Sequence, residues 1–77
     1  MTGDWLTTDA FARLRCVSRR RAQQVLGAWQ RERAAGEAVP RVRTVPGGRG
    51  RPALHVLAAD VAQLYALSDE DVHQLAA

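Results

Sequence analysis

Three consecutive arginines, Arg19 to Arg21, and two glutamines, Gln23 and Gln24, form the densest group of side chains that could bind a ligand. Guanidinium groups make paired hydrogen bonds with phosphate, and a glutamine amide can pair with the edge of adenine. No acid, base or nucleophile stands among these five residues. The chemistry that they favour is recognition of a polyanion.

One helix, over residues 18–34, is predicted to position these side chains. Ser18 can cap its first turn, and Gly36 suits a left-handed stop just past its end. The apolar positions recur at helical spacing and form a core face: Ala22, Val25, Leu26 and Trp29. The opposite face and its flanks carry the polar set: Arg19, Arg20, Arg21, Gln23, Gln24 and Arg31.

The three arginines stand where helix electrostatics disfavours them. A helix N-terminus carries a positive partial charge, so each cation there costs about 0.3 to 1 kcal/mol. Ser68 to Asp71, which begins a later helical segment, obeys the dipole rule with three acids, so the departure is local. We interpret it as a docking site for an anion such as phosphate. The alternative is a solvated basic face with no partner.

The charge of the chain is unevenly distributed. All 11 basic residues are arginines between Arg13 and Arg51, and only Glu32 and Glu37 oppose them, so this stretch carries a net charge of +9. Acidic segments flank it, and the whole chain of 77 residues has a net charge of +3. A basic block of this kind is the electrostatic footprint expected for a nucleic-acid partner.

Other functions have little support. His55 and His73 lie 18 residues apart without metal-ligand spacing, and no serine or cysteine stands beside an evident base, so we expect no catalysis, metal or cofactor. Cys16 is the only cysteine, which favours a reducing compartment and a packing role in the turn before Ser18. No run is long and apolar enough for a membrane span, and a cytoplasmic location is expected.

The elements around the basic helix suggest a small α-rich domain. Thr7 or Thr8 can cap a first helix that runs through Leu14, and a three-residue connection, 15–17, joins it to the basic helix, as in a helix-turn-helix. Residues 39–45 and 53–57 are predicted strands around an arginine-bearing glycine loop, 46–52. Such a hairpin is called a wing; the alternative is a plain surface loop that happens to be basic.

Two further helices are expected. The first begins at Ala58 or Ala59, runs to Ala66 and closes the core, and the second is a short one capped by Ser68. The predicted fold class is therefore mainly α with a small β-hairpin, a winged helix-turn-helix, with this domain over residues 1–67. Residues 68–77 are expected to serve as a dimerisation segment or the start of a linker, because Val72 and Leu75 have no obvious place in so small a core.

The order of short motifs resembles two groups of DNA-binding domains. The motifs are Trp5-Leu6-Thr7-Thr8, Phe11-Ala12, Val17-Ser18-Arg19-Arg20, the glycine loop and Ala59-Asp60-Val61. Across residues 5–66 this order is similar to the winged domains of the MerR and excisionase group. It is also similar to the Mu-type phage domain of repressors and transposases, which the long second helix favours. The resemblance implies that residues 18–31 enter the major groove and that Arg49 and Arg51 approach the minor groove or the backbone.

Individual roles follow for a double-stranded DNA partner. Gln23, Gln24 and Arg20 are predicted to read base edges. Contacts with phosphate are assigned to Arg19, Arg21, Arg41, Arg43 and Arg51, and either role is open to Arg31 and Arg49. The chain is expected to be a transcriptional regulator or the DNA-binding arm of a phage or mobile-element protein, as a weak homodimer or fused to a larger chain.

An acidic protein or RNA remains the alternative partner for this basic surface. RNA-binding modules usually stack bases on exposed aromatic side chains. The aromatic residues of this chain look core-facing: they are Trp5, Phe11, Trp29 and Tyr65. RNA is therefore the weaker of the two alternatives.

Overall fold

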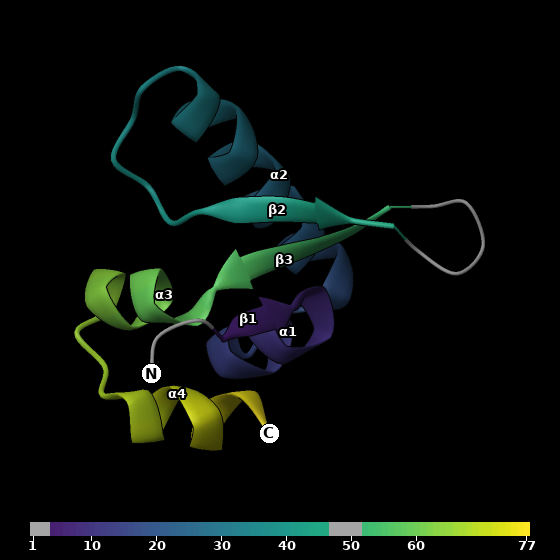
Figure 1. Cartoon of the computed structure of the whole chain (residues 1–77). Helices are drawn as coiled ribbons and strands as arrows, with labels where there is room; N and C mark the ends of the chain where they lie inside the picture. The colour runs from purple at the N-terminus through teal and green to yellow at the C-terminus, as the bar shows by residue number, and fades with distance from the viewer. Residues whose placement is uncertain (1–3, 47–51) are drawn as a thin grey trace.

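The computed structural model describes residues 4–46 and 52–77, and within them four helices pack with a three-stranded antiparallel sheet (Figure 1). The elements in chain order are β1 (Trp5–Thr7), α1 (Thr8–Arg15), α2 (Arg19–Ala34), β2 (Val42–Val45), β3 (Ala53–Leu57), α3 (Ala58–Leu64) and α4 (Asp69–Ala76). The predicted α-rich class with a β-hairpin is confirmed at this level. The sheet has one strand more than the sequence indicated.

The helices begin where the capping residues predict. Thr7 Oγ1 accepts a hydrogen bond from the backbone N–H of Ala10 at 3.0 Å, and Ser18 Oγ accepts one from Arg21 at 3.1 Å. Past the end of α2, Gly36 has a φ of 94°, the left-handed conformation expected of it. The bounds of α2 are therefore confirmed at both ends.

The turn between α1 and α2 depends on Cys16. This residue has a φ of 54°, in the left-handed region, and its backbone N–H donates to the carbonyl of Arg13 at 3.2 Å. The next N–H, of Val17, donates to the carbonyl of Ala12 at 3.0 Å, so two carbonyls at the end of α1 are satisfied. The thiol is exposed, so the expected packing role of Cys16 is wrong. The residue ends a helix instead of filling space.

The third strand comes from the short apolar start of the chain. The sheet order is β1-β3-β2, with Leu6 and Val42 on either side of Val56. β2 begins at Val42 and not at residue 39 as predicted. The reason is local, since Pro40 has no N–H and the N–H of Arg41 donates to the Asp60 carboxylate at 2.9 Å.

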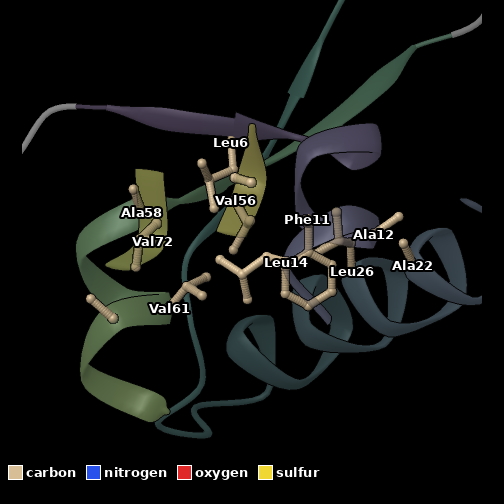
Figure 2. Packing of buried hydrophobic residues seen from close by; sticks show 12 residues of the cluster. Leu6, Phe11, Ala12, Leu14, Ala22, Leu26, Val56, Ala58, Val61 and Val72 are labelled. Atoms are coloured by element: carbon tan, nitrogen blue, oxygen red, sulfur yellow. The ribbon is translucent and has the colours of Figure 1, made fainter. Parts of the chain in front are cut away.

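The core lies between the inner face of this sheet and the four helices (Figure 2). Its largest fully buried side chains are Phe11, Leu26, Val56, Val61 and Val72. The ring of Phe11 meets Trp29 edge to face, with the ring centroids 5.3 Å apart. Each helix therefore supplies at least one core residue.

The C-terminal helix α4 is part of this packing. Val72 and Ala76 are buried, and the Arg13 Nε–H of α1 donates to the carbonyl of Ala76 at 2.9 Å. The expectation that Val72 has no place in the core is wrong, because α4 lies against both α1 and α3. Leu75 is 47% exposed and stays outside the core.

α3 ends at Leu64, two residues earlier than predicted, and Ala66 follows with a φ of 55°.

Trp5 does not face the core, contrary to the sequence prediction. Successive residues of a strand point to opposite faces, and its neighbour Leu6 is the buried one. Trp5 lies half-buried on the outer face of the sheet, where the Arg43 guanidinium carbon is 4.4 Å from its ring centroid. Phe11 is buried, and Trp29 and Tyr65 are half-buried against the core, as predicted.

An exposed ion pair ties α4 to the start of β1. His73 Nε2 lies 3.3 Å from Asp4 Oδ2, and its Nδ1–H donates to the carbonyl of Asp69 at 2.7 Å. The Asp69 carbonyl first, and the Asp4 carboxylate second, raise the pKa of His73 above its ordinary value of 6.5. The protonated imidazole is the form that these contacts favour.

We expect this contact to make the stability of the fold weakly pH-dependent. The folded chain holds the proton of His73 more tightly than the unfolded chain, so the contact contributes fully below the unfolded pKa. Its contribution is lost as pH rises through the raised pKa of the folded state. The midpoint of thermal unfolding should therefore fall slightly from about pH 6 to about pH 8 in the native chain relative to His73→Gln. Parallel midpoints for the two proteins would contradict the assignment.

Candidate nucleic-acid interface

A hollow of about 670 Å³ lies between the first half of α2 and the start of β3, at the loop end of the β2–β3 hairpin. Arg19, Arg20 and Gln23 line it from α2, and Pro52, Ala53 and Leu54 form the facing wall. Thr8 completes the lining, and its Oγ1–H donates to the carbonyl of Leu54 at 2.8 Å, which holds the start of α1 against β3. The hollow thus has one basic, amide-bearing side and one largely apolar side.

The arginines on the exposed face of α2 differ in their partners. Across residues 4–46 and 52–77, no ion pair or hydrogen bond engages the guanidinium group of Arg20, Arg21 or Arg31. The first turn of α2 contains no acidic residue, whereas the first turns of α1, α3 and α4 each contain at least one. Arg19 is the exception, because its Nε lies 3.2 Å from Asp9 Oδ1 of α1. Positive charge is therefore concentrated and largely uncompensated at the start of α2.

The two glutamines are both exposed, but only one of them lines the hollow. Gln23 lines it, and Gln24 lies one position further round the helix, outside the lining. Arg31 is further along α2 and folds back toward Gly27, where an added Cβ would lie 3.6 Å from its Nη1. Arg20 and Gln23 are thus the pair of predicted base-reading residues that the structure brings to one place.

Two predicted phosphate contacts lie away from this surface. Arg41 stands just before β2, at the end of that strand remote from the hairpin loop, with its Nε 3.7 Å from Asp60 Oδ2. Arg43 lies on the outer face of the sheet over Trp5, whereas α2 packs against the inner face. The remaining predicted contacts, Arg49 and Arg51, belong to a segment, 47–51, outside the described residues. The described part of the predicted set is therefore divided between three places.

Several other polar side chains have structural partners that sequence spacing did not reveal. Gln30 Nε2–H donates to Thr44 Oγ1 at 2.9 Å and fastens α2 to β2. Arg33 donates to the carbonyl of Val39 at 2.9 Å, and the Arg15 guanidinium lies 4.0 Å from the Tyr65 ring centroid. Figure 1 shows the result, with the β2 and β3 ribbons crossing α2. Of these contacts, the one between Gln30 and Thr44 joins α2 directly to the hairpin.

The described residues contain no group of three or more histidine, cysteine, aspartate or glutamate side chains placed to hold a metal ion. Nor does that part of the chain include a helix both long and apolar enough to cross a membrane. Comparisons with protein-family models, with curated proteins and with solved structures find nothing that matches the chain.

Proposed function

We propose that the chain binds double-stranded DNA with the exposed face of α2 in the major groove. The observation that carries this proposal is the cluster of Arg20, Arg21 and Gln23 at the start of α2, with no acid in the first turn. A B-DNA major groove is about 12 Å wide and admits one α-helix. In helix-turn-helix proteins the N-terminal residues of the second helix reach the base edges. The three-residue connection from α1 to α2 suits that arrangement.

The hairpin gives the proposal its second element. In a winged helix-turn-helix, a hairpin after the second helix lies beside the groove that the helix occupies. Here the hollow separates α2 from the start of β3, at the loop end of the hairpin, so a strand of the DNA backbone would pass between Arg20 and Pro52. Arg49 and Arg51 would then contact the backbone or the minor groove. The role served is transcriptional regulation or recognition of a phage or mobile-element end.

RNA binding receives less support. A single-stranded RNA site needs aromatic faces on which bases stack. Trp5 lies on the outer face of the sheet, where the Arg43 guanidinium lies over its ring. An acidic protein partner would bind the same arginines, but it offers no base edges with which the amides of Gln23 and Gln24 could pair. Both classes are therefore outcomes of the test that follows.

We expect binding to duplex DNA to depend steeply on salt. Arg20, Arg21 and Arg31 together with the two loop arginines suggest about five neutralised phosphates, hence a slope of log K against log salt near −4.5. The measurement is a fluorescence-anisotropy titration over a range of salt with three labelled probes of equal charge. These are a duplex, a single-stranded RNA and a poly-glutamate peptide.

The duplex should bind most tightly at every salt concentration. Equal affinity for all three probes would mean that only net charge is recognised. Preference for RNA or for the peptide would replace the proposal with the corresponding alternative. A slope close to zero with the duplex would contradict nucleic-acid binding through these arginines.

A further inference from the structure

Of the three arginines in the first turn of α2, Arg19 is the one whose charge is compensated by an acid within residues 4–46 and 52–77. Its Nε lies 3.2 Å from Asp9 Oδ1, and the two side chains are 69% and 55% exposed. Arg19 also lines the hollow beside Arg20, so the Asp9 carboxylate stands at the edge of the proposed DNA-binding surface. Asp9 belongs to the first turn of α1, where the helix dipole favours a negative charge and helps to hold it.

The ion pair does not serve as a brace between the two helices. α1 and α2 are already held together by Phe11, Ala22 and Leu26, all buried in the core. Another arginine–aspartate pair in the described part of the chain, Arg41 with Asp60, shows what a bracing contact looks like. There Asp60 is 24% exposed and accepts a hydrogen bond from the backbone N–H of Arg41 as well as facing its guanidinium. Among the described residues, the Asp9 carboxylate has Arg19 alone as its side-chain partner, and its exposure leaves the pair screened by water.

We infer that Asp9 competes with DNA phosphate for Arg19, an inference that rests on the proposed DNA-binding function. A phosphate that reaches Arg19 must displace a carboxylate instead of a mobile counterion. Arg19 therefore adds little to the affinity for DNA backbone, and the charge of Asp9 opposes the approach of any phosphate. Because backbone affinity is independent of sequence, this competition lowers non-specific binding. The contacts of Arg20 and Gln23 with base edges then account for a larger share of the discrimination between sites.

The test replaces Asp9 by asparagine and measures binding to a random-sequence duplex. One additional phosphate contact should tighten binding roughly five- to tenfold near 0.1 M salt and steepen the salt slope by about 0.9. Glu70→Gln is the matched control, since it makes the same change of net charge on α4, where Glu70 accepts a hydrogen bond from Gln74. That control should alter the affinity less than about twofold.

A double-mutant cycle isolates the pair. Arg19→Gln should barely change the slope in the native background but should cancel the whole gain in the Asp9→Asn background. Thermal unfolding checks that each variant folds, and Asp9→Ser offers a second neutral side chain that also suits the first turn of a helix. If Asp9→Asn and Glu70→Gln raise the affinity equally, or if Arg19→Gln leaves the gain intact, the competition does not exist.

Failure of this inference differs from failure of the proposed function. In the first case the native chain binds duplex DNA with a steep salt slope, and the Asp9 variants behave like the control. In the second case the native chain itself shows no preference for the duplex over RNA or poly-glutamate, and Asp9→Asn gains nothing specific to DNA.

Discussion

Replacing Arg20 and Arg21 together by glutamine should weaken binding to duplex DNA roughly fiftyfold near 0.1 M salt and flatten the salt slope by about 1.8. Both guanidinium groups lie at the exposed start of α2, where the described residues supply no acidic partner. Each should therefore release one counterion equivalent when it meets a phosphate. Glutamine keeps a long polar side chain, so the change removes charge without emptying the surface.

The matched control is the double variant Arg15→Gln and Arg43→Gln. It removes the same net charge from two arginines that stack on Tyr65 and Trp5, away from the hollow. We expect a change of less than about threefold and an almost unaltered slope. If both double variants lose the same affinity, the DNA senses the overall charge of the chain and α2 has no special role. The division between α2 and the outer sheet face would then be wrong.

Phe11→Ala should remove a large part of the stability of the fold. The side chain is 1% exposed and meets Trp29 edge to face, so truncation leaves a cavity where α1 and α2 join. Such changes cost about 3 to 5 kcal/mol, whereas a domain of this size has about 4 to 12 kcal/mol in total. We therefore expect the variant to keep at most about three quarters of the native free energy of unfolding and to unfold at a clearly lower urea concentration.

Urea denaturation followed by circular dichroism measures this loss, with Leu75→Ala as the control. Leu75 is 47% exposed on α4, so its truncation should change the free energy of unfolding by less than about 0.5 kcal/mol. A Phe11→Ala variant with a loss below about 1.5 kcal/mol would mean that the contact between α1 and α2 is not the centre of the core.

The helices could be predicted from the sequence because their signals are local. Ser18, Gly36 and the apolar spacing of α2 lie within or beside that helix, and each determines backbone geometry close to itself. The strand β3 was also predicted with its correct bounds, because a glycine loop and a β-branched residue mark it.

What could not be predicted depends on contacts between distant residues. The three residues of β1 carry no alternation, and they become a strand because Leu6 lies beside Val56 of β3. The partners of three arginines also lie on other elements, well separated from them along the sequence: Asp9 for Arg19, Asp60 for Arg41 and Trp5 for Arg43. The sequence shows which side chains are cations, but it does not show which of those cations are paired with an acid in the folded chain.

The pairing of β1 with β3 also bears on the order in which the molecule assembles. Trp5 pairs with Leu57 across the sheet, and the Thr8 hydroxyl donates a hydrogen bond to the carbonyl of Leu54. Each contact joins residues near the N-terminus to β3 and so closes most of the chain into a loop. Contacts across such sequence separations form late and slow folding, whereas neighbouring helices and hairpins form early. We therefore expect α1, α2 and the β2–β3 hairpin to form first as separate local units. The docking of β1 then locks them at one angle, so the hollow beside Gln23 acquires its shape only in the final step of folding.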